Sequence, residues 1–182
     1  MLSPFSLPEH SQLYTEAIQL LDNCLAQKNT DRLVAFIQQQ VIVEPPDLDF
    51  LRDFSEALSQ RVLALRTNLY DIRDNVVRVF GKDYNIDITP LTPPNAIERY
   101  YTLPPDKVIA YIRKQPNLPS DNDLRMLTKL LEISLMTASR ITAEVMLARE
   151  LEALVRDWQE ALSNSLGRRS WPEEQSRQGH VH

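Results

Sequence analysis

The sequence predicts a mostly α fold, an elongated helical bundle built around two long helices. Glycine occurs only 3 times in 182 residues, although average usage would give about thirteen. All-β folds rely on glycine turns, so this scarcity disfavours them. Two long stretches, about 47–80 and 121–166, contain neither proline nor glycine. Their apolar residues recur at steps of three and four, as on one face of a helix.

Two shorter helices are expected at the N-terminal end. From Pro8 to Gln27, apolar residues that include Cys24 recur at helical spacing. A second helix is expected from Asp31 to about Val41, with Thr30 as its N-cap. Glu44-Pro45-Pro46 should end it, because the residue before a proline is pushed out of the helical region.

The first long helix is expected over about 47–80. Its seam is Leu51, Phe54, Leu58, Val62, Leu65, Leu69, Ile72, Val76 and Val79. The mean step is near the 3.5 residues of a coiled coil, which favours packing along another long helix. Asp47 and Asp49 suit the positive N-terminal end, and Gly81 suits a left-handed C-terminal cap.

The second long helix is expected over about 121–166, with Asp121 and Asp123 as start signals and Gly167 as a stop. Its apolar residues cover more than one face of the helix. Beyond the main apolar face, the additional residues are Met126, Leu130, Ile133, Met146, Leu147 and Leu154. Between about 130 and 154 the helix should therefore be covered on more than one side. The cover is either the N-terminal helices or a second copy of the protein.

A Pro-rich crossover, 82–119, joins the long helices and contains 7 of the 12 prolines. Residues 84–89 alternate with period two, so they form either a strand without a visible partner or an arm laid over the bundle. Two short helices are expected at Asn95–Tyr101 and Asp106–Lys114, the second preceded by prolines in the place where proline is tolerated.

We expect residues 1–167 to form a single helical domain and residues 168–182 a flexible polar tail. The net charge of -5 repels nucleic acid and anionic lipid. No stretch approaches the length of a membrane span, and no secretion signal is visible. The single cysteine fits a reducing compartment, so a cytoplasmic location is expected.

The residues that catalysis needs are scarce, so no catalytic, cofactor-binding or metal-binding residue is assigned and no enzyme is predicted. The chain lacks the closely spaced glycines of nucleotide-binding loops. Its histidines lie outside the expected core elements, which disfavours triads and metal sites; they are His10, His180 and His182. Glu132 and Glu144 remain as carboxylates within an apolar stretch, but they lie about 120° apart around the helix.

Two sets of residues are candidates for binding. The first set is a candidate for protein binding, because aromatic and arginine side chains are enriched at interfaces and two prolines beside them make a rigid corner. Its members are Arg99, Tyr100, Tyr101, Pro104, Pro105 and Trp171. The second, for nucleic acid, consists of arginines on the first long helix: Arg61, Arg66, Arg73 and Arg78. Acidic residues are interleaved with these arginines, so a solvated, ion-paired face is the competing interpretation.

These observations predict a non-enzymatic cytoplasmic interaction protein, such as an assembly factor, adaptor or regulatory partner, that acts through protein–protein contacts. A homodimer through the last helix is one form of it. A helical nucleic-acid-associated regulator that uses the arginine-bearing helix is the alternative. A further alternative is a bundle enzyme or small-ligand carrier that uses Glu132 or Glu144.

Overall fold

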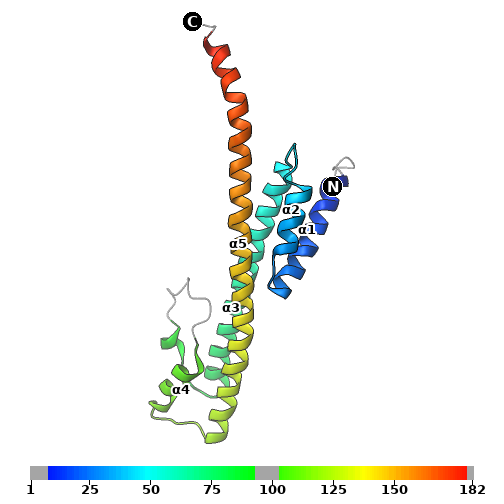
Figure 1. The fold of residues 1–182 in the computed structure, drawn as a ribbon. Helices are drawn as coiled ribbons and strands as arrows, with labels where there is room; N and C mark the ends of the chain where they lie inside the picture. Colours follow the sequence, from blue (N-terminus) through cyan, green and yellow to red (C-terminus); the bar gives the residue numbers. More distant parts are fainter. Residues whose placement is uncertain (1–7, 93–102, 180–182) are drawn as a thin grey trace. The chain divides into compact units, whose positions relative to one another are not determined.

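The fold is mostly α-helical, as predicted (Figure 1). The computed structural model describes the backbone of residues 8–92 and 103–179, and the side chains of 12–92 and 103–166. These residues form α1 (Pro8–Gln27), α2 (Asp31–Gln40), α3 (Leu48–Asp83), a short 3₁₀ helix η1 (Thr89–Leu91), α4 (Pro105–Arg113) and α5 (Asp121–Gly179). No strand occurs in the described ranges, and the two long predicted helices are α3 and α5.

The chain divides into two compact units. Unit 1 contains Met1–Arg61 and Met146–His182, and unit 2 contains Val62–Val145. The two long helices contribute to both units, since the boundaries fall inside α3 and inside α5. The single domain predicted for residues 1–167 stays a prediction.

Unit 1 packs α1 and α2 with the first part of α3 and the later part of α5. The rings of Phe50 and Phe54 stack with centroids 5.7 Å apart and planes 10° apart. The buried side chains around them come from all four helices: Ala17, Leu21, Cys24, Leu25, Leu33, Ile37, Leu58, Ala148, Leu151 and Val155. The Ser59 hydroxyl donates to Glu152 Oε1 at 2.8 Å, which ties α3 to α5 at the surface of this core.

The α1–α2 junction corrects one predicted cap. Lys28 takes a left-handed conformation, φ 56°, and the Asn29 N–H donates to the Cys24 carbonyl at 3.0 Å. Asn29 Oδ1 in turn accepts from the Asp31 N–H at 3.0 Å. Thr30 stands at the N-cap position with helical backbone angles and without a side-chain capping bond, whereas a residue that caps with its side chain normally takes extended backbone angles.

The starts of the two long helices agree more closely with the positions predicted from the sequence. The Asp47 carboxylate accepts from the Phe50 N–H at 3.0 Å, so it caps α3 as an acidic residue at a helix N-terminus should. The Ser120 hydroxyl accepts from the Asp123 N–H at 3.2 Å and caps α5 in the same way.

The end of α3 differs from the prediction. Gly81 lies inside the helix, and none of the described glycines has a positive φ. The left-handed residue is Asn85, φ 55°, and the Ile86 N–H then donates to the Phe80 carbonyl at 2.9 Å. Asparagine tolerates this conformation better than most residues, so the turn does not need a glycine.

Replacing Gly81 by alanine should therefore raise the free energy of unfolding by up to about 1 kcal/mol, because glycine is the poorer helix former. An added Cβ would meet the Ile86 carbonyl oxygen at 3.9 Å, an ordinary contact. Asn85→Ala is the opposite control and should lower stability, since alanine disfavours positive φ. Urea unfolding measures both, and a destabilised Gly81→Ala variant would contradict this placement.

Unit 2 has a separate core in which the segment after α3 is an arm and not a strand. The core consists of Val76, Phe80, Ile86, Ile88, Leu103, Val108, Ile112, Leu127 and Leu131. Ile86 and Ile88 come from the arm, residues 84–88, and are 8% and 0% exposed. The Tyr111 hydroxyl donates to the Asp87 carbonyl at 3.3 Å and links the arm to α4.

Asp87 closes the turn that leads from the arm into η1. Its Oδ1 accepts from the Thr89 hydroxyl at 2.6 Å and from the Thr89 N–H at 2.9 Å. These bonds, the one to the hydroxyl first, hold the pKa of the Asp87 carboxyl below its ordinary value of 3.8. The carboxylate is therefore ionised at neutral pH, in the form that accepts both bonds.

The last two elements confirm one prediction and correct another. Helix α4 begins at Pro105, with Pro104 at the N-cap position, as the two prolines suggest. The helix predicted at 95–101 lies outside the described residues. Helix α5 continues through Gly167 to Gly179, so the predicted stop is wrong. A glycine inside a helix costs only about 1 kcal/mol, which does not oblige the helix to end there.

Candidate interaction surfaces

The predicted recognition residues are only partly within the described structure. Pro104 and Pro105 start α4 beside the buried Leu103. Three candidates, Arg99, Tyr100 and Tyr101, lie outside the described residues, and so does the side chain of Trp171. The prediction that these groups form one recognition surface stays a prediction.

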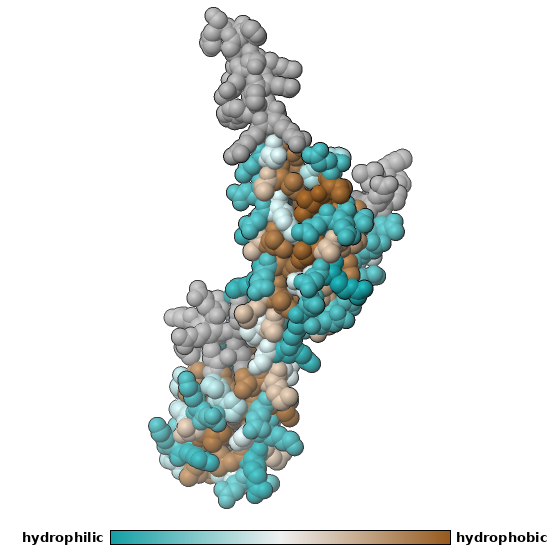
Figure 2. Space-filling view, in the orientation of Figure 1, coloured by the Kyte–Doolittle hydropathy of each residue, from teal (hydrophilic) through white to brown (hydrophobic). Residues whose placement is uncertain are grey.

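Part of α5 in unit 2 carries an exposed apolar surface, here named the α5 stripe. Its members are Met126, Leu130, Ile133 and Met136. Met126, Ile133 and Met136 are 57%, 55% and 74% exposed, and Leu130 is half-buried against the core. Steps of four, three and three residues place the four on one side of the helix. Apolar surface of this kind is visible on both units in Figure 2.

The α5 stripe is distinct from the surface of α5 that holds unit 2 together. Leu127, Leu131 and Ala138 are 1%, 0% and 1% exposed and face the unit 2 core. Met126 is turned about 100° from its neighbour Leu127 around the helix axis. The sequence predicted this breadth of apolar surface, and within the described chain no element of unit 2 buries Met126, Ile133 or Met136.

A second surface is the α4–α5 groove of unit 2. Along α4 it is a hollow of about 330 Å³ lined by Pro105, Asp106, Ile109, Ala110, Arg113, Thr128 and Glu132. Near the end of α4 it widens to about 630 Å³, lined by Ile109, Arg113, Asp121, Leu124, Arg125, Thr128, Lys129 and Glu132. The two hollows share Ile109, Arg113, Thr128 and Glu132, so they form one groove.

Unit 1 holds an apolar hollow of about 380 Å³ where the α2–α3 turn meets α5. It is lined by Ile42, Val43, Glu44, Pro45, Pro46, Leu162, Ser165 and Leu166. Val43 and Leu166 are 49% and 41% exposed. The sequence signal was the Pro45-Pro46 turn together with Leu162 and Leu166, one helical turn apart, but only the fold shows that they meet.

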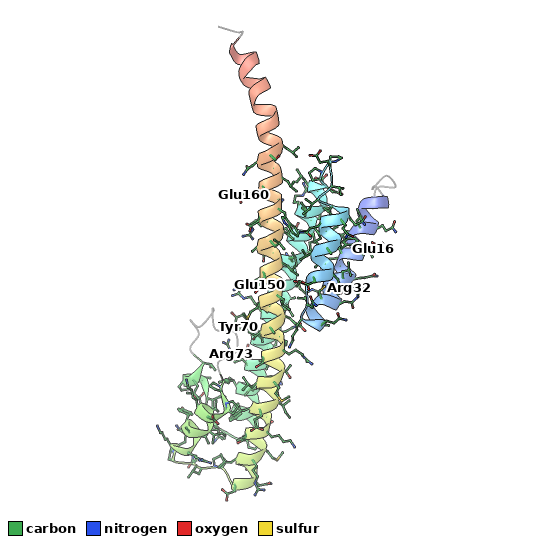
Figure 3. All side chains as sticks on the ribbon, in the orientation of Figure 1. Glu16, Arg32, Tyr70, Arg73, Glu150 and Glu160 are labelled. Atoms are coloured by element: carbon green, nitrogen blue, oxygen red, sulfur yellow. The ribbon has the colours of Figure 1, made fainter. Side chains whose placement is uncertain are left out.

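The arginines predicted for nucleic acid have different surroundings, and their role in binding stays a prediction. Arg61 is paired with Asp22 at 2.6 Å. The Arg73 guanidinium lies over the Tyr70 ring, 5.1 Å from its centroid, and both side chains are labelled on α3 in Figure 3. Arg78 donates to Asn75 Oδ1 at 2.5 Å. Helical geometry also separates Arg78 from Arg73 by about 140° around the axis.

The two candidate carboxylates have different surroundings. Glu132 is exposed and lines the α4–α5 groove, whereas Glu144 is half-buried. The groove residues include neither histidine nor cysteine, so the lining supplies no group that ordinarily titrates near neutral pH. Within the described chain, His, Cys, Asp and Glu side chains form no group of three that could hold a metal ion.

Comparison with known proteins gives no match: no family model matches the chain, and no curated protein or solved structure matches it either. In the part of the chain that the structure describes, none of the helices combines the length and apolar character that a membrane crossing requires.

Proposed function

We propose that the protein is a non-enzymatic helical interaction protein, an assembly factor, adaptor or regulatory partner, that associates with a second copy of itself through the α5 stripe. The observation that carries the proposal is the exposure of Met126, Ile133 and Met136 on one side of a packed helix. Exposed apolar groups that gather into a patch mark interaction surfaces more often than scattered ones do. The proposal keeps the predicted cytoplasmic location, which rests on the single cysteine.

The spacing of the stripe supports a helix as its partner. Met126, Leu130 and Ile133 follow the four-and-three pattern of a coiled-coil seam, in which side chains of one helix fit between those of another. A second copy offers the same pattern, and two-fold symmetry would bring the two stripes together as one self-complementary interface. The two methionines can adapt their shape to such a contact.

The stripe is short, so we expect weak self-association. A standard stable interface buries about 800 Å² on each partner, which is more than four side chains supply. The dimer should therefore form in the micromolar range and dissociate on dilution.

Light scattering coupled to size-exclusion chromatography tests the proposal over about 5 to 200 μM protein. The wild-type mass should rise toward that of a dimer. Ile133→Asp should stay monomeric, because the dimer would bury an unpaired carboxylate, and its helical circular dichroism should match wild type because the site is exposed.

Met146→Asp is the matched control. Met146 is also on α5 and is 58% exposed, but it belongs to unit 1 and is not a member of the α5 stripe. This variant should associate like wild type. A wild-type protein that remains monomeric at about 200 μM, or equal disruption by both substitutions, would contradict the α5 stripe as a self-association surface.

A further inference from the structure

The methionines of α5 are unusually exposed. The sequence contains 4 methionines, and those whose side chains the structure describes all lie on this helix. Met126, Met136 and Met146 are 57%, 74% and 58% exposed, although methionine is among the residues most often found buried. These side chains are therefore open to small dissolved reagents.

The thiol of the chain is shielded by contrast. Cys24 is 3% exposed and lies in the unit 1 core, and a thiol buried in apolar surroundings reacts poorly. In the part of the chain that the structure describes, a sulfur oxidant therefore reaches the thioethers of α5 before it reaches the thiol.

Two of these methionines belong to the α5 stripe. Met126 and Met136 are its first and last members, with Leu130 and Ile133 between them. Oxidation converts the apolar thioether of methionine into a polar sulfoxide, and burial of a polar group without a hydrogen-bond partner costs free energy. An oxidised stripe is therefore a poorer surface for packing against a second copy of the chain.

We propose that Met126 and Met136 are oxidation sites for hydroperoxides, and that their oxidation dissociates the two copies of α5. This inference rests on the self-association proposed above. With hydrogen peroxide, the thioether sulfur attacks one oxygen, the O–O bond breaks, and that oxygen stays on sulfur. The sulfur gives two electrons to the peroxide, whose second oxygen takes up the proton of the first and leaves as water.

The change is reversible, and association opposes it. Methionine sulfoxide reductases return the sulfoxide to the thioether, a step in which two thiols become a disulfide and water is released. Because the stripe is covered only when two copies associate, the dimer should slow the oxidation of Met126 and Met136. Met146 lies outside the stripe, so its oxidation should not depend on protein concentration.

Light scattering of the full chain before and after hydrogen peroxide treatment tests the proposal, with oxidation at each methionine measured by peptide mass spectrometry. Over about 5 to 200 μM, the reduced chain should approach the mass of a dimer. Oxidation of Met126 and Met136 should raise the dissociation constant about tenfold or more. Helical circular dichroism should not change, because both sites are exposed, and reductases for both sulfoxide epimers, with dithiothreitol, should restore the dimer.

Leucine variants identify which methionines are responsible. Met126→Leu with Met136→Leu keeps the stripe apolar at similar volume, so this variant should form a dimer that peroxide does not dissociate. Met146→Leu is the matched control, because it removes an equally accessible thioether outside the stripe. Its dimer should remain as sensitive to peroxide as that of wild type.

The outcomes separate this inference from the proposed function. A reduced chain that stays monomeric at about 200 μM contradicts self-association, and this inference with it. Self-association stands and this inference fails if the oxidised chain associates as well as the reduced one, or if peroxide dissociates the double leucine variant. It also fails if dilute protein is oxidised at Met146 and not at Met126 and Met136.

Discussion

Replacing Phe54 by alanine should lower the free energy of unfolding by about 3 to 5 kcal/mol, the usual cost of removing a buried phenylalanine ring. Phe54 is 0% exposed and stacks on Phe50, which is equally buried. The substitution removes the ring and leaves a cavity between α3 and the helices packed on it. Alanine is a good helix former, so the loss would come from packing and not from the backbone of α3.

Urea unfolding followed by circular dichroism measures this loss. Gln60→Ala is the control on the same helix, because Gln60 is exposed and should change stability by less than about 0.5 kcal/mol. A cost below about 1 kcal/mol for Phe54→Ala would mean that the unit 1 core is looser than the stacked rings indicate.

Ile88→Ala should cost about 2 to 5 kcal/mol, although Ile88 belongs to no regular element. Its side chain is 0% exposed in the unit 2 core, where Phe80, Val108 and Leu127 also lie. If residues 84–88 were an exposed loop that did not pack on the core, the same substitution would have little effect on stability. The expected cost therefore measures how firmly the arm is docked.

Thermal and urea unfolding of this variant can be compared with Lys82→Ala, which changes an exposed side chain just before the arm. Lys82→Ala should alter stability by less than about 0.5 kcal/mol. If Ile88→Ala behaves in the same way as Lys82→Ala, the arm is not part of the unit 2 core.

The helices were predictable because each one must bury an apolar face, and apolar residues therefore recur in the sequence at steps of three and four. The predicted helix 8–27 matches α1, and the long proline-free stretches match α3 and most of α5. Helix ends were less predictable. Glycine marks a stop only where the chain has to turn with a left-handed residue, and at the end of α3 the burial of Ile86 places that residue at Asn85.

The two candidate surfaces differ in how much of each could be predicted from the sequence. The α5 stripe was foreseeable as surplus apolar surface, since Met126 and Ile133 exceed what one seam needs. The α4–α5 groove was not, because its charges come from two helices whose alignment is set by tertiary packing. Asp106, Arg113 and Glu132 are ordinary surface charges in the sequence, and only the alignment of α4 with α5 brings them together around one groove.

The burial of Cys24 makes the chain well suited to site-specific labelling. It is the single cysteine and is 3% exposed, so a thiol reagent would find it shielded in the folded protein. A cysteine introduced at Met146, which is 58% exposed and lies outside the α5 stripe, would then be the one reactive thiol. If two copies associate as proposed, a spin label or fluorophore attached there would report the distance between their α5 helices without removal of the native cysteine.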